Sequence, residues 1–470
     1  MIPIVEIPTL VSHYASYYRD LFTEAGYAHF QRYLSGLLVC ENKTVSQINQ
    51  AFIVEPRDQS TLNRFLTQGR YEVSALNERR LSQLQAHPDT CMRDKGKSRG
   101  VLGIDDTLLT HVGGCFDQIH RLWDHANNRY ELAHNLVNLY YSDPHTDYPV
   151  DFELWEPPDL VRIEQGLVEQ GIGLKAAKFS LKQSDPAKWR KYLLGVLSRK
   201  AKKDWELNSL YRNKVIIAME LLTRFFERYP DHDLPVAFDS WFTTPQMCQY
   251  IDQQLNRSYV GALKVDKAEL ILGRKSKVKL AEFIDQLTTG HKQGKKPLFR
   301  YLEVKRKDKT RGYFVYCKTH RLKNYGKVRL LISFQTADLS DSPKVYISNR
   351  LDWRDTTICR IYNYRWPVEP FHQQAKEQGL DQYQIRDFQA IQKHVAFVLI
   401  VFSFLTMARK DPELLSKLQL STDATEESLA FWNRLIRAQT LLTLIQWVKV
   451  ALEQGMAWDK ITQPILQAFA

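Results

Sequence analysis

Val101-Leu-Gly-Ile-Asp105-Asp106-Thr107 is the stretch at which the pattern of the chain changes from helical spacing to a short apolar run. A run of this length that ends in two acids predicts a buried β-strand with carboxylates at its C-terminal end. Leu234-Pro-Val-Ala-Phe-Asp239 has the same character and predicts a second such strand. Buried strands separated by helical segments are typical of an α/β core.

Other segments fit the same architecture. Residues 134–141 form a third apolar run, while residues 189–197 and 214–228 have helical spacing. Strands and helices in this order predict an α/β core with a mixed sheet. Alternating runs between residues 259 and 349, separated by lysine- and glycine-rich turns, predict a β-rich insertion.

The charge of the 470-residue chain is positive and unevenly placed. The formal net charge is +12 and the pI about 9.2, and 44% hydrophobic residues exclude a disordered chain. Residues 257–329 hold 21 Lys and Arg against 6 Asp and Glu, a net charge of +15, so the rest of the chain sums to −3. A basic balance of this size predicts a polyanionic partner, with nucleic acid ahead of a membrane surface.

Cysteine usage and the apolar runs predict a soluble protein in a reducing compartment. None of the six cysteines lies in a C-x-x-C pair, and no zinc spacing is present. The N-terminus lacks the basic start and apolar core of a signal peptide. The longest apolar run, residues 395–407, is too short to span a bilayer and predicts a buried helix. We therefore expect a cytoplasmic protein without membrane association.

A second informative stretch is Tyr362-Asn-Tyr-Arg365-Trp-Pro-Val-Glu369-Pro-Phe-His-Gln-Gln-Ala-Lys376. Its tyrosine, arginine, glutamate and lysine are spaced by three, four and seven residues, which on a helix returns side chains to one face. That face would carry a carboxylate flanked by two cations and a phenol, a surface suited to a metal ion together with a phosphate.

The acidic sites Asp105/Asp106, Asp239 and Glu369 predict a phosphoryl-transfer centre. Carboxylates from separate elements can hold two Mg²⁺ ions, for which Mn²⁺ substitutes, and two such ions stabilise the attacking and leaving oxygens at phosphorus. Arg365 and Lys376 would position phosphates. Taken singly, each acid has a plainer interpretation: a turn residue, a helix N-cap, or one half of a surface Arg–Glu ion pair.

Together these motifs resemble the DDE transposases of bacterial insertion sequences, in the group named after insertion sequence four. The signature of that group, Y-x₂-R-x₃-E-x₆-K, matches Tyr362, Arg365, Glu369 and Lys376 without a gap. Residues 103–107 are similar to the first acidic motif of the group, and residues 236–239 to its second. The resemblance covers about residues 100 to 410.

The resemblance implies an RNase H-like core of the retroviral integrase superfamily that binds two Mg²⁺ ions. Its ligands would be Asp105 or Asp106, which the motif leaves open, together with Asp239 and Glu369. Tyr362, Arg365 and Lys376 would grip phosphates at the transposon end. The implied activity is cut-and-paste transposition through a hairpin on the transposon end, by a homodimer on double-stranded DNA.

The predicted division of the chain follows from these patterns. Its segments are 1–95 (helical N-terminal DNA-binding domain), 96–256 (first part of the core), 257–350 (basic β-rich insertion), 351–410 (second part of the core, with the Y-R-E-K helix) and 411–470 (helical region, candidate for dimerisation). Further phosphate contacts are predicted in the insertion, at Lys275, Lys277, Lys305, Arg306 and Lys307.

Two features leave alternatives open. Some members of the group stack a tryptophan of the insertion on a flipped base, whereas this chain has Val345 at that place, so Tyr346 or Trp353 would take this role or it would be absent. Two other functions are compatible with the motifs: a catalytically inactive or domesticated DNA-binding derivative, and an RNase H-like structure-specific nuclease.

Overall fold

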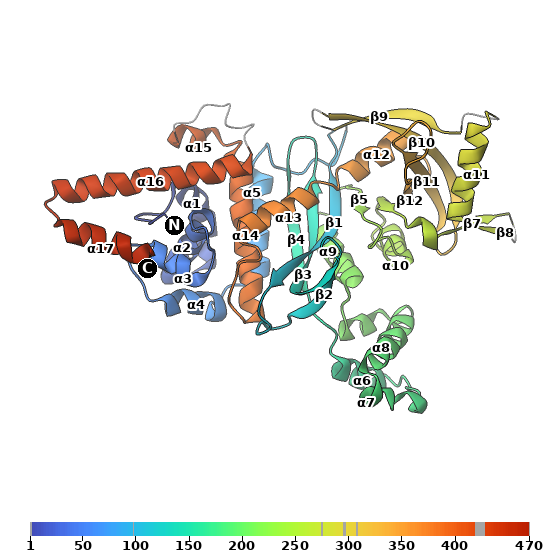
Figure 1. The fold of residues 1–470 in the computed structure, drawn as a ribbon, viewed down its shortest axis with the longest axis horizontal. Helices are drawn as coiled ribbons and strands as arrows, with labels where there is room; N and C mark the ends of the chain where they lie inside the picture. The colour runs from blue at the N-terminus through green and yellow to red at the C-terminus, as the bar shows by residue number, and fades with distance from the viewer. Residues whose placement is uncertain are drawn as a thin grey trace.

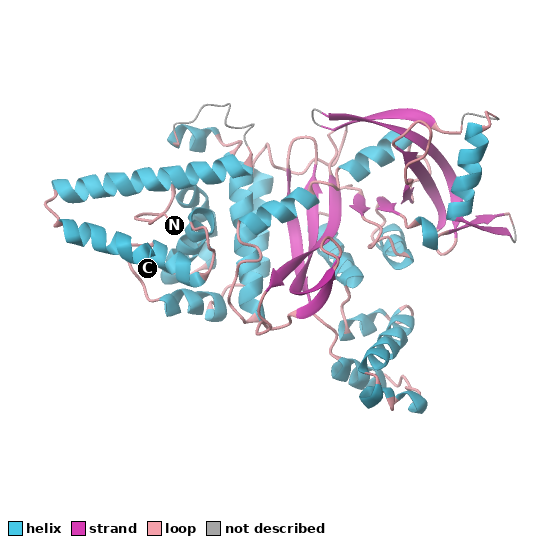
Figure 2. Cartoon of the chain, viewed as in Figure 1, coloured by secondary structure: helices cyan, strands magenta, loops and turns pink. Residues whose placement is uncertain are grey.

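The computed structural model describes residues 2–469 apart from residues 97, 274–275, 295–297, 307–308 and 419–427, and only the backbone of residues 305, 306 and 309. One twelve-stranded sheet crosses the molecule, with helices packed on it and beyond its end (Figures 1 and 2). The N-terminal helices and the C-terminal hairpin lie on one side of the view, and the end of the sheet lies on the other.

Six strands form the central part of the sheet: β1 (Val101–His111), β2 (His120–Asp124), β3 (Arg129–Ser142), β4 (Asp147–Trp155), β5 (Val236–Phe238) and β6 (Tyr259–Ala262). β3 pairs antiparallel with β1, β2 and β4, whereas β1, β5 and β6 run parallel to one another. The predicted α/β core with a mixed sheet is therefore confirmed. β1 is longer than predicted, because β3 continues to pair with it beyond the two acids.

The predicted insertion continues this sheet rather than forming a separate one. β6, placed by the sequence in the insertion, pairs with β5 and with β12 (Lys344–Ser348). Beyond it follow β11 (Gly326–Phe334), β10 (Lys309–Leu322), β9 (Arg300–Arg306), β7 (Glu269–Leu272) and β8 (Ser276–Lys279). The boundary at residue 257 thus divides paired strands, and helix α11 (Leu280–Lys292) was not predicted.

Helix α14 (Phe388–Ala408) is the centre of the main hydrophobic core. The helices of the N-terminal region pack around it and share that core: α1 (Thr9–Ala15), α2 (Glu24–Val39), α3 (Val45–Ala51), α4 (Gln59–Gln68) and α5 (Val73–Ala86). Among the described helices, α14 and α16 (Leu429–Glu453) are long and apolar enough to cross a membrane; 94% of the most apolar window of α14 is buried inside the protein, against 22% for α16. The predicted buried helix at residues 395–407 is thus confirmed.

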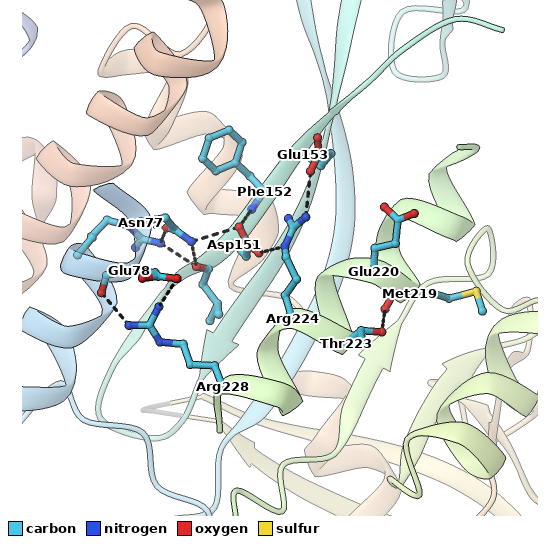
Figure 3. A network of polar contacts seen from close by, with 12 residues as sticks. Asn77, Glu78, Asp151, Phe152, Glu153, Met219, Glu220, Thr223, Arg224 and Arg228 are labelled. Atoms are coloured by element: carbon cyan, nitrogen blue, oxygen red, sulfur yellow. Dashed lines mark hydrogen bonds and ion pairs between the residues drawn. The ribbon is translucent and has the colours of Figure 1, made fainter. Parts of the chain in front are cut away.

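A polar network fastens α5 to β4 and to helix α9 (Lys214–Arg228), as Figure 3 shows. The side chain of Arg224 donates to Asp151 at 2.9 Å and to Glu153 at 3.2 Å, while Asn77 donates to Asp151 at 3.2 Å. Charge-assisted hydrogen bonds of this kind fix geometry as well as adding stability. The network and the shared hydrophobic core thus connect the N-terminal helices with the sheet.

Between β4 and α9 the chain forms a small helical lobe, which we call the helical module (residues 156–213). It contains α6 (Leu160–Glu169), α7 (Leu181–Ser184) and α8 (Pro186–Ala201), and projects from the sheet in Figure 1. Its buried side chains, among them Trp189 and Leu193, form a cluster separate from the main core. The C-terminal region adds α15 (Pro412–Lys417) and a hairpin of α16 and α17 (Trp458–Phe469).

Because its hydrophobic cluster is separate, we predict that the helical module can unfold while the rest of the protein stays folded. Leu193→Ala removes a fully buried side chain, which costs about 2–5 kcal/mol in protein cores. Hydrogen exchange followed by mass spectrometry should show lost protection in α6 to α8 and unchanged protection in α14. Leu222→Ala, in the main core on α9, is the matched control and should weaken protection throughout. Loss of protection across the chain in Leu193→Ala would contradict an independent module.

Candidate active site

Asp105 and Asp239 meet where the parallel pairing of β1 with β5 ends. The pairing of β1 with β5 ends at Ile104 and Phe238, so Asp105 and Asp239 are the next residues of each strand. Neighbours in register point to the same face of a sheet. One oxygen of Asp239 also accepts hydrogen bonds from the backbone N–H groups of Trp241 and Phe242, at 2.9 and 3.1 Å. The two predicted strand-end acids are therefore side by side.

The Y-R-E-K segment is not a single helix. Helix α12 (Asp355–Asn363) carries Tyr362, residues 364–367 form a turn that holds Arg365, and α13 (Val368–Glu377) carries Glu369 and Lys376. Pro367 explains the break, because proline lacks an N–H and disfavours helical geometry in the residue before it. The prediction of one helix was wrong, although the four-residue step still brings Arg365 to Glu369.

Arg365 joins the two halves of the site. Its Nη1 donates to Oδ2 of Asp105 at 2.8 Å and its Nη2 to Oε1 of Glu369 at 2.5 Å. The arginine side chain is 9% exposed, and its guanidinium lies 5.4 Å from the centre of the Tyr362 ring. Gly103 contributes to this arrangement: a Cβ there would already touch the backbone of Arg365 at 3.6 Å, so a longer side chain would push the arginine away.

Burial raises the pKa of Asp105 to about 7. The positive charge of Arg365 opposes this shift, while the negative charges of Asp239 and Asp106 add to it. Crowded carboxylates of this kind favour an added cation, because each negative charge destabilises the next.

Asp106 lies on the opposite side of β1, as expected from the alternation of side chains along a strand. Its Oδ2 accepts hydrogen bonds from Nδ2 of Asn135 at 2.7 Å and from Nζ of Lys214 at 2.8 Å. The lysine ammonium also lies 4.3 Å from the centre of the Trp241 ring. Neither Lys214 nor Trp241 was singled out from the sequence, since no motif marks the first residue of a helix or an indole in a loop.

A cleft of about 700 Å³ opens beside these carboxylates. Its walls include Asp105, Asp106, Asp239, Lys214 and Lys376. Two indoles also line it, those of Trp123 and Trp241, which are 41% and 39% exposed. By contrast, Tyr346 and Trp353, the predicted candidates for base stacking, are both buried, and Tyr346 packs on Tyr362 with ring centres 4.2 Å apart.

Histidines near the site are engaged in hydrogen bonds. His134 contacts the hydroxyl of Tyr383 at 2.7 Å and the carbonyl of Asp117 at 2.8 Å. His372, one turn after Glu369, shares a hydrogen bond of 2.9 Å with Asn138, and burial lowers its pKa to about 3. A histidine with so low a pKa is neutral at physiological pH.

The donor set fits a hard divalent cation in kind, because Asp105, Asp239 and Glu369 offer only carboxylate oxygens. The described part of the chain holds no group of three or more acidic, histidine or cysteine side chains already arranged around a single metal position. The guanidinium of Arg365 instead provides the counter-charge between Asp105 and Glu369. These three residues would hold the metal ions that the sequence predicts.

The structure describes only some of the residues of the insertion that were predicted to contact phosphates. Lys277 is exposed on β8. Lys275 and Lys307 lie outside the described residues, and for Lys305 and Arg306 only the backbone, in β9, is described.

Removal of the Arg365 guanidinium is predicted to leave the neighbouring carboxylates of Asp105 and Glu369 without a counter-charge. Arg365→Gln should destabilise the protein by about 1.5–3 kcal/mol in EDTA, the usual contribution of hydrogen bonds to charged groups. Mg²⁺ should raise the melting temperature of this variant more than that of the unaltered protein, because its carboxylates lack a counter-charge. Arg354→Gln, at an exposed arginine before α12, is the control for thermal-shift measurements. Equal stabilisation of all three proteins by Mg²⁺ would contradict the assignment.

The similarity of the chain to known proteins agrees with this geometry. No curated protein matches the chain. The family described as DDE superfamily endonuclease matches residues 17–310, which include Asp105, Asp106 and Asp239. Enzymes of this superfamily are nucleases and transposases that generally use divalent metals and act on DNA. By this match over more than half of its length, the chain belongs to the DDE superfamily endonucleases.

Proposed function

We propose that the chain is the transposase of a bacterial insertion sequence, related to the group with the Y-R-E-K signature, and that it acts by cut-and-paste transposition. It would cleave DNA at the terminal inverted repeats of its element and join the 3′-OH ends to target DNA. The observation that carries this proposal is that three carboxylates converge. Asp105 lies beside Asp239, and Arg365 binds both Asp105 and Glu369.

In this proposal Asp105, Asp239 and Glu369 hold two Mg²⁺ ions on an RNase H-like core. The ions would stabilise the attacking and leaving oxygens of the displacement at phosphorus. Asp106 binds Lys214 at the wall of the same cleft and would orient this lysine. Arg365 would exchange its carboxylate partners for a DNA phosphate, since its planar guanidinium suits both in a bidentate manner. Tyr362 and Lys376 would bind neighbouring phosphates.

The hairpin step needs a surface on which an extruded base can stack. Because Tyr346 and Trp353 are buried, we propose that the exposed indoles of Trp123 and Trp241 in the cleft provide this surface. Stacking on an aromatic ring contributes about 1–3 kcal/mol per base.

The partners follow from the reaction. Both ends of an element must be cut and joined together, so we propose a homodimer on double-stranded DNA, with the N-terminal helices in sequence recognition. The hairpin of α16 and α17 is our candidate for the dimer contact, because it exposes apolar side chains that include Leu442, Ile445 and Leu466. The enzyme would work in the bacterial cytoplasm, at the nucleoid.

Glu369→Gln is predicted to abolish DNA cleavage with little effect on folding, because Glu369 is 47% exposed and keeps its shape as glutamine. The assay uses a plasmid that carries the flanking ends of the element, incubated with protein in Mg²⁺ or in EDTA, followed by mapping of the DNA ends. The unaltered protein should excise the element in Mg²⁺ only. Glu377→Gln, at an exposed position of the same helix α13, is the matched control and should cleave normally.

Each outcome distinguishes one part of the proposal. Excision that leaves hairpins on the element supports the complete route, whereas excision without hairpins rejects only the stacking role of the cleft indoles. Cleavage that survives in Glu369→Gln would reject the carboxylate assignment. Salt-sensitive DNA binding without cleavage by any protein would favour the inactive DNA-binding derivative, for which Arg365 between the carboxylates is the supporting observation.

A further inference from the structure

The helical module is inserted at the wall of the candidate active site. The chain leaves the core after Trp155 at the end of β4 and returns at Lys214, the first residue of α9, and both residues line the cleft. The module is fastened at this base: Trp155 donates to the hydroxyl of Tyr211 at 3.2 Å, and Arg212 forms an ion pair with Glu220 at 2.6 Å. A nucleic acid with its reacting phosphate in the cleft would therefore run close to the module.

The module contains the second basic region of the chain. Residues 175–203 contain ten Lys and Arg and a single acid, Asp185, a net charge of +9. Residues 257–329 alone account for the net excess of the chain, because the charge of residues 175–203 cancels against acids elsewhere. The remaining residues of the chain sum to −12. The positive charge is thus concentrated in two places.

Helix α8 arranges part of this charge in a row. Lys188, Lys191, Arg199 and Lys202 are exposed and follow one another at steps that return to one side of a helix. The opposite side, with Trp189, faces the core of the module. Within the described part of the chain, Lys188 pairs with Asp185, at its own helix start, whereas Lys191, Arg199 and Lys202 have no ion-pair partner.

Gly195 lies in the middle of this row and has no evident role inside the protein. Glycine is among the least favourable residues for a helix interior. The backbone there has ordinary helical geometry, and an added Cβ would meet only Nη1 of the exposed Arg199 side chain, at 3.4 Å. A bare backbone between four cations is explained if a partner approaches the helix closely at this point.

We propose that this face of α8, which we call the basic row (Lys188, Lys191, Gly195, Arg199 and Lys202), binds the sugar–phosphate backbone of the DNA duplex that leaves the cleft. From Lys188 to Lys202 the row extends about 21 Å at 1.5 Å per residue. At about 3.4 Å per phosphate level along a strand, this length corresponds to about six base pairs. Phosphate contacts carry no sequence information, so the row would position the duplex without selecting it.

This proposal rests on the proposed function, but its test does not require cleavage. Binding of a 40-base-pair duplex of arbitrary sequence is measured in EDTA at several salt concentrations. Replacement of Lys188, Lys191, Arg199 and Lys202 by Gln should weaken binding at least about tenfold at 0.1 M salt. It should also reduce the slope of log affinity against log salt by up to about 3.6, since each phosphate contact contributes about 0.9. The control replaces four exposed cations that lie outside the proposed DNA and dimer contacts, namely Lys95, Arg354, Arg386 and Lys417, by Gln, and should bind the duplex as the unaltered protein does.

Gly195→Leu provides a second variant that keeps all charges. Leucine favours the helix, so the module should remain folded by circular dichroism, yet the side chain should hold the DNA away and weaken binding several-fold. The role of the basic row would be overturned if the fourfold Gln variant and Gly195→Leu both kept the affinity and the salt dependence of the unaltered protein. If the unaltered protein also bound and cleaved DNA normally, the proposed function would remain intact. The role of the basic row would also be overturned if the two variants lost binding to anionic phospholipid vesicles but still bound the duplex normally. Failure of the unaltered protein to bind the duplex would reject both proposals.

Discussion

The contact of one guanidinium with two carboxylates determines how the candidate active site is assembled. Arg365 binds Asp105 on β1 and Glu369 on α13, residues that lie far apart in the chain. Without a shared cation, three acids would crowd the end of two parallel strands, and burial already raises the pKa of Asp105 to about 7. The site therefore needs positive charge, which Arg365 supplies in this structure and which metal ions would supply during the proposed phosphoryl transfer.

The fold makes this contact possible because it brings distant segments of the chain together around one sheet. β1 and β5 bring Asp105 next to Asp239, while Pro367 turns the chain so that Glu369 approaches from α13. The sheet then continues without a break into the basic insertion. The helical module begins and ends at the wall of the cleft, so both basic regions are connected directly to strands or helices of the site.

Much of this arrangement could be predicted from sequence, because its elements have local signals. The runs that end at Asp105 and Asp239 predicted buried strands, and helix α9 has the predicted bounds. Contacts between distant segments could not be predicted in this way. The pairing of β6 with β5, the contact of Arg365 with Asp105 and the place of Lys214 depend on register and on side-chain direction. The basic row could not be predicted either, because a net charge summed over long segments does not show which charges share one face of a helix.

The central claim is that Asp105, Asp239 and Glu369 form one metal site. Fe²⁺ can replace Mg²⁺, and with ascorbate and peroxide it generates radicals that cleave the backbone beside the bound ion. Our account predicts cuts near Asp105, Asp239 and Glu369, suppressed by excess Mg²⁺, lost in Asp105→Asn and retained in Asp106→Asn. Cuts at other places, or cuts that are lost in Asp106→Asn and persist in Asp105→Asn, would contradict it.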